Sequence, residues 1–118
     1  MERYVDGYIL PVSKKNLPAY RQMAQEAAKV WRKHGALDYK ECVGEDLKTK
    51  WGLPFPRMMK LKPGEEVVFS YIVFKSRAHR DRVNSKVMEE MAKMCEAKDM
   101  PFDVKRMVYG GFKVLVEA

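Results

Sequence analysis

The sequence holds few of the residues that build metal, redox or nucleophilic centres. It has two cysteines, Cys42 and Cys95, and two histidines, His34 and His79, and none of them stands in a paired spacing. Zinc sites need such clusters, so we expect no metal ion, and we expect both thiols to pack as small hydrophobic groups. A glycine-rich phosphate loop and a serine–histidine–acid pattern are also missing, so no cofactor is expected.

Long apolar runs are missing too. No stretch is apolar for long enough to cross a membrane, and the charged opening residues do not resemble a signal peptide. Apolar residues make up 47% of the chain and charged residues 33%, which is typical of a globular protein. We therefore expect a single cytoplasmic domain over residues 1–118 that buries a core without disulfides.

Positively charged residues outnumber the acidic ones, which gives the chain a net charge of +7. Such an excess raises nucleic acid as a partner. Both halves of the chain share it, however, and no basic tail or arginine-rich run is present, so a solvated basic surface is the favoured interpretation. Association with RNA remains the alternative.

The hydrophobic pattern predicts four strands and two helices in the order β-α-β-β-α-β. The strands are expected at residues 4–12, 36–43, 67–74 and 106–116. Ser13 or Asn16 is expected to cap the first helix, which stops at Gly35; Ser76 is expected to cap the second, which ends at residues 98–101. Residues 44–64 are too long for a hairpin turn, and we expect them to fold back as an arm over an edge, a cavity or a partner subunit.

This order predicts a ferredoxin-like α+β fold. Right-handed crossovers place the first and third strands at the centre of a four-stranded antiparallel sheet, with both helices on one face. The strand at 67–74 and the last strand are apolar on both faces. Because the helices cover only one face, we expect a second copy of the chain to cover the other, as a homodimeric α+β barrel.

A familiar pattern runs through nearly the whole chain, in residues 5–12, 31–36, 75–81, 99–103 and 106–112. These blocks resemble the YbaA-like family of small bacterial proteins of unknown function. The resemblance implies the dimeric α+β barrel superfamily, and with it the same fold and dimer. That superfamily includes cofactor-free monooxygenases acting on polycyclic aromatic substrates, haem-degrading enzymes and proteins without known activity. The family supplies no catalytic residues.

Asp6 is the first candidate site residue, because an unpaired carboxylate in a central strand would be costly. Arg106, or the hydroxyl groups of Tyr8 and Tyr109, could reach it from the neighbouring strand. A buried acid satisfied by arginine and tyrosine is the favoured interpretation. An acid that lines a ligand pocket is the alternative.

A second candidate site lies at the start of the second helix, where Ser76, Arg77, His79 and Arg80 gather. Free backbone N–H groups and arginines together suit a phosphate or carboxylate. A solvated face, with nearby acids paired to the arginines, is the competing interpretation.

The third candidate is a pocket between helices and sheet, which would suit a flat apolar ligand; plain core is the alternative. Its predicted lining is Trp31, Tyr71, Met91 and Tyr109. The sequence thus favours a homodimer that binds a small apolar or acidic metabolite, or a cofactor-independent enzyme of the monooxygenase kind. An RNA-associating protein and a structural dimer without ligand are the alternatives.

Overall fold

The computed structural model describes residues 2–94 and 100–118, and its elements follow the predicted order. In chain order these elements are β1 (Tyr4–Ser13), η1 (Lys14–Asn16), α1 (Leu17–Lys33), β2 (Asp38–Val43), α2 (Phe55–Met58), β3 (Glu65–Phe74), α3 (Arg77–Met94), η2 (Val104–Arg106) and β4 (Val108–Lys113). Cys95 and the expected helix end at Lys98 and Asp99 lie outside the described residues.

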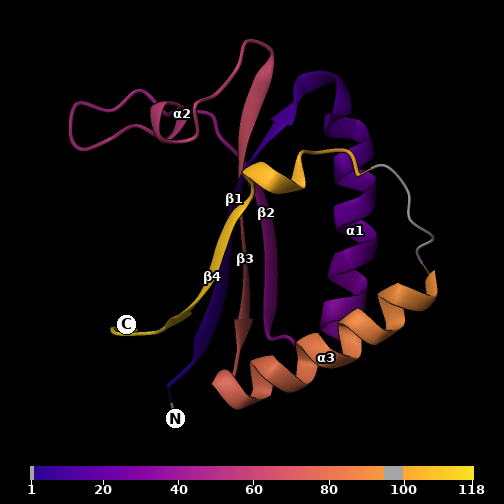
Figure 1. Cartoon of the computed structure of the whole chain (residues 1–118). Coiled ribbons are helices and arrows are strands. Elements are labelled where there is room, and N and C mark those ends of the chain that lie inside the picture. The colour runs from indigo at the N-terminus through magenta and orange to yellow at the C-terminus, as the bar shows by residue number, and fades with distance from the viewer. Residues whose placement is uncertain (1, 95–99) are drawn as a thin grey trace.

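The four strands form one antiparallel sheet in the order β2-β3-β1-β4. β1 and β3 pair along their whole length, from Tyr4 opposite Phe74 to Ser13 opposite Glu65. Helices α1 and α3 lie on the same side of the sheet (Figure 1). The predicted ferredoxin-like fold, with its central and edge strands, is therefore confirmed. Among the described residues, no helix combines the length and the apolar character needed to cross a bilayer.

The last strand is shorter than predicted. β4 begins at Val108 rather than at Arg106, which belongs to the short turn η2. It ends at Lys113 because Lys113 lies opposite Tyr4, the first residue of β1, so later residues have no strand to pair with. One further bond among the described residues continues the ladder, from the N–H of Val114 to the carbonyl of Arg3.

The helices bury one face of the sheet around two apolar clusters. One is built on Leu10, Val12 and Val68 against Tyr20 and Ala24 of α1. The other joins both helices to β3, and its buried members are Ala27, Val30, Trp31, Ala36, Ile72, Phe74, Val83 and Val87. The steps of three and four residues along α1 place its stripe on this core, as the sequence predicts.

The opposite face, which we call the open face, is mainly apolar, and most of it is uncovered. Side chains alternate along each strand, and cross-strand partners share a face, so the register assigns its members. Phe69 is 43% exposed, Val108 56% and Phe112 62%. Pro11 and Val67 share this face but are buried, and its remaining apolar members are Val5, Ile9, Phe69, Tyr71, Val73, Val108 and Phe112.

Residues 44–64, which we call the arm, connect β2 to β3 and contain α2. The arm projects to the side of the sheet opposite α1 and α3, which is the side of the open face (Figure 1). Its base is tied down, because Met59 is buried and Arg106 donates to the carbonyl of Lys60. The outer part of the arm is not held in this way, since Trp51 is 87% exposed and Leu53 is 61% exposed.

Candidate functional site

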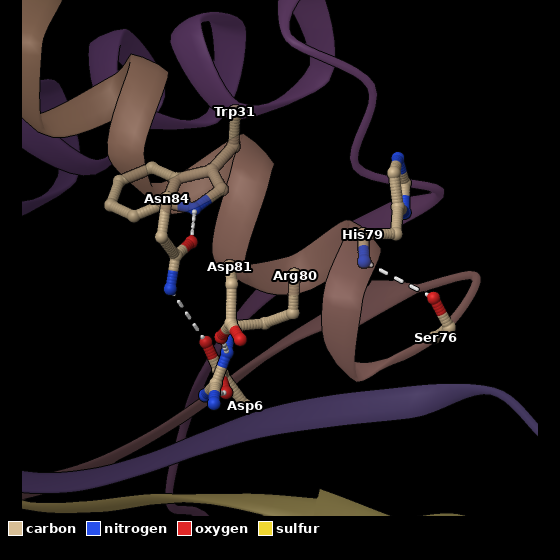
Figure 2. Close-up of polar contacts among 7 residues, drawn as sticks. All are labelled: Asp6, Trp31, Ser76, His79, Arg80, Asp81 and Asn84. Atoms are coloured by element: carbon tan, nitrogen blue, oxygen red, sulfur yellow. Dashed lines mark hydrogen bonds and ion pairs between the residues drawn. The ribbon is translucent and has the colours of Figure 1, made fainter.

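Asp6 is buried on the helix-covered face of β1, and each of its carboxylate oxygens accepts a hydrogen bond (Figure 2). Its Oδ1 accepts from Nη1 of Arg80 at 2.7 Å, and its Oδ2 accepts from Nδ2 of Asn84 at 3.1 Å. Oδ1 of Asn84 in turn accepts from the indole Nε1 of Trp31 at 2.9 Å. The network therefore joins β1 to both helices, and it satisfies a carboxylate that would otherwise be costly to bury.

Arg80 holds three groups together. Besides Asp6 it binds Oδ1 of Asp81 through Nε at 2.7 Å, and its guanidinium lies 4.8 Å from the centre of the Tyr4 ring. Burial opposes its charge, but the hydrogen bond to Asp81 and the charge of Asp6 outweigh this and raise the pKa of Arg80. Gly111 leaves room for the side chains of Tyr4 and Arg80, because a Cβ at this position would lie 2.5 Å from the Tyr4 hydroxyl and 2.8 Å from Arg80 Nη1.

The predicted partners of Asp6 are wrong. Arg106 binds Glu65 instead, at 2.6 Å and 3.0 Å, and these bonds hold the pKa of the Glu65 carboxyl below its usual value. The register gives the reason: Asp6 lies opposite Gly111, whereas Arg106 precedes β4 altogether. Tyr109 stacks on Tyr8 with ring centres 5.7 Å apart.

Ser76 and His79 both form hydrogen bonds with the backbone at the start of α3. The Ser76 hydroxyl accepts from the His79 backbone N–H at 3.1 Å, which is the expected cap (Figure 2). Nδ1 of His79 accepts from the Lys75 N–H at 3.0 Å, so the ring is neutral with its proton on Nε2. Burial, and then the charges of Lys75 and Arg82, lower the pKa of His79. Gly35, at φ +114°, lets this ring pack closely.

Arg77 is the remaining member of the predicted anion site. It is exposed and lines a shallow hollow of about 410 Å³ beside Tyr4, Gly111 and Lys113. Arg80 turns instead to Asp6, and the Ser76 hydroxyl is used by the helix itself. Three of the four predicted residues thus have partners within the chain, and anion binding at Arg77 stays a prediction.

The predicted apolar pocket between helices and sheet is wrong. Trp31 is buried in the core under the helices, and Met91 packs against the same cluster. Tyr71 lies on the open face, because it pairs with Gly7 and Lys40 and alternates with the buried Ile72. The sheet therefore separates Tyr71 from the other residues of the predicted lining.

A larger hollow lies elsewhere, between α1 and the edge strand β2, and we call it the α1–β2 groove. Its volume is about 780 Å³, which is within the range of small-molecule sites. Its lining is mainly apolar. The lining residues are Leu17, Pro18, Tyr20, Arg21, Ala24, Gln25, Ala28, Tyr39, Glu41, Cys42, Val43 and Val68.

Glu41 is the one carboxylate of this lining. Its Oε1 accepts from the hydroxyl of Tyr20 at 2.8 Å, and its Oε2 accepts from that of Tyr39 at 2.6 Å. Burial, followed by the nearby Glu41 charge, raises the pKa of both tyrosines, so both hydroxyls remain donors at neutral pH. Tyr39 and Glu41 are two residues apart on one strand face, and this spacing was the sequence signal that could have found the pair.

Comparison with known proteins agrees with this fold. Residues 3–104 match the family model described as a protein of unknown function (DUF1428). The chain is 38% identical over 115 residues to the uncharacterized protein YbaA of Escherichia coli K12, covering 98% of both chains, and equally similar to YbaA of Shigella flexneri. A crystal structure described as a dimeric ferredoxin-like protein, from an uncultured marine organism, superposes over the full length of both chains with a TM-score of 0.64 at 10% identity. The chain belongs to the DUF1428 family.

Proposed function

We propose that the protein is a homodimer whose subunits each bind a small, largely apolar molecule in the α1–β2 groove. The observation that carries ligand binding is the groove itself: about 780 Å³, walled by aliphatic side chains and two tyrosine rings, with a single carboxylate among them. Sites of this kind, mostly apolar with a few converging polar groups, are typical of small-molecule binding.

The open face supports the dimer. From the usual strand spacing and rise, two strands of ten residues and two of six give about 500 Å² of sheet. A stable interface buries about 800 Å² on each partner, so the open face supplies most of that area. The marine protein with the same fold is described as dimeric, which agrees with this proposal.

The arm supplies the rest of the interface in this proposal. It projects on the side where a second subunit would lie (Figure 1), and it carries Trp51 and Leu53 exposed to water. Tryptophan is enriched at the buried centres of interfaces and is costly to leave in water over its whole surface. We infer that each arm packs its outer apolar residues on the partner subunit.

A neutral aromatic probe tests the ligand site. Backbone amide shifts of the labelled protein are recorded by NMR while 2-phenylethanol is added at millimolar concentrations. Shifts are expected along β2 and the groove side of α1. Ala28→Phe fills the groove and should abolish them, whereas Ala19→Phe, an exposed position of α1 outside the groove, should leave them unchanged. Shifts that persist in the Ala28→Phe variant, or that occur at residues outside the groove, would count against the site.

RNA association, the alternative from the sequence, rests on the net charge of +7 alone. Phosphate contacts release counterions, so RNA binding of this kind would weaken steeply with salt. Binding of the neutral probe in the groove would be insensitive to salt, and this difference separates the two functions.

A further inference from the structure

We infer that the α1–β2 groove selects a cationic ligand: an aromatic or aliphatic amine, or a quaternary ammonium compound. This inference rests on the proposed function of the groove and names the chemical class of its ligand. It departs from the acidic metabolite that the sequence suggests, because the half-buried charge of the groove is a carboxylate, which would repel an acid.

Glu41 is the group that would bind the cation. It points to the helix side of β2 and is half-buried, and both of its carboxylate oxygens accept from tyrosine hydroxyls, not from a cation. The ion pairs found among residues 2–94 and 100–118 do not include Glu41. A carboxylate offers about four lone-pair positions, and the two tyrosines use two of them, so room remains for an ammonium N–H.

The tyrosines add a second preference for positive charge. Tyr20 and Tyr39 both line the groove, and the face of a tyrosine ring attracts a cation within about 6 Å of its centre. Their hydroxyl groups also fix the carboxylate in one orientation, so a ligand does not have to order it. Aromatic rings are the usual recognition groups for quaternary ammonium ions, and a carboxylate beside them adds a charge-assisted acceptor.

The one cation that lines the groove does not cancel this charge. Arg21 lies on the exposed side of α1, and no hydrogen bond between it and Glu41 is present among the described residues. An apolar body held by Leu17, Ala24 and Val68 would place an ammonium group at Glu41 while leaving Arg21 in water. The lining thus carries one acid and one base, but the acid is half-buried in the groove whereas the base is exposed.

Three probes of equal size test the ligand class: 2-phenylethylamine as the cation, 2-phenylethanol as the neutral analogue and phenylacetate as the anion. Each is titrated into the full-length protein by NMR at neutral pH. The amine is expected to bind at least about tenfold more tightly than the alcohol, since a charge-assisted hydrogen bond is worth about that factor or more. Phenylacetate is expected to bind most weakly.

Two variants assign the preference to Glu41. Glu41→Gln keeps an acceptor for the tyrosines and should remove the tenfold advantage of the amine while the alcohol still binds. Glu26→Gln, at an exposed position of α1 outside the groove, should change neither affinity. Circular dichroism melts check that each variant is folded.

The outcomes are distinguishable. If amine and alcohol bind equally in the groove, or if Glu41→Gln leaves the amine advantage intact, the cationic ligand class is wrong. The proposal of an apolar ligand site in the groove would still hold in that case. If none of the three probes shifts groove resonances, the proposed function is wrong as well. Preferred binding of phenylacetate would overturn the inference outright.

Discussion

Removing Arg80 should destabilise the protein more than neutralising its partner Asp6. The Asp6 side chain is only 5% exposed, so Arg80→Gln leaves a buried carboxylate with Asn84 as its remaining side-chain donor. Deleting one partner of a buried ion pair costs about 3–5 kcal/mol. Because Asn84 stays and Arg80 is 18% exposed, we expect the lower end, about 3 kcal/mol.

The reverse substitution is milder for a reason visible in the same network. Asp6→Asn leaves Arg80 bound to Asp81 at 2.7 Å and partly in water, so its charge is still satisfied. The expected cost is about 1.5–2 kcal/mol, the lower end of the range for a hydrogen bond to a charged group. In the double variant the two effects should not add, because each removes the same contact.

Urea unfolding at neutral pH and one fixed protein concentration measures these costs, since dimer stability depends on concentration. With a slope of about 1–3 kcal/mol per molar urea, the Arg80→Gln midpoint should fall by about 1–3 M. Equal midpoints for Arg80→Gln and wild type, or a larger loss for Asp6→Asn than for Arg80→Gln, would refute the account of this network.

Three further expectations follow from the described contacts. Because the pKa of His79 is lowered in the folded protein, the unfolded chain binds a proton at a higher pH than the folded protein does. Stability should therefore fall as the pH drops through the ordinary value of 6.5. His79→Gln should flatten this profile, and an unchanged profile would contradict the expectation. Gly111→Ala should cost about 1–2 kcal/mol by crowding Tyr4 and Arg80. Gly110→Ala should cost less in urea unfolding, because its methyl group meets no atom of the same chain within 4 Å, and the opposite ranking would be evidence against this packing. Acrylamide quenching of tryptophan fluorescence, compared between wild type and Trp51→Phe, should show that Trp51 is shielded in the dimer. Full accessibility of Trp51 to acrylamide would rule out the packing of the arm on a partner.

The sequence predicts the sheet well because its signals are local. Alternation with a period of two assigns each side chain of β3 to a face, and short steps along α1 place its buried stripe. The same rule separates Tyr71 from Trp31, so the predicted pocket was wrong because it combined residues from both sides of the sheet. Faces are readable from the sequence, whereas a cavity is not.

Side-chain partners are harder to predict because they depend on tertiary distance. Asp6 and Arg80 are 74 residues apart, and the sequence suggested Arg106 or two tyrosines as partners until the register placed Arg106 before β4. Glu41 lies in the most polar strand, which the sequence assigns to an edge. Its tyrosine partners come from its own strand and from α1, and only the packing of that helix shows that they enclose a groove.

The oligomeric state tests the central claim, which is that a second subunit covers the open face. Light scattering coupled to gel filtration at micromolar concentration should give twice the chain mass of 13.8 kDa for the wild type. Val108→Glu, at a position of the open face that is 56% exposed, should give 13.8 kDa, and Met88→Glu, on α3 and 54% exposed, should remain dimeric. A wild-type protein that elutes as a single 13.8 kDa chain would contradict the account.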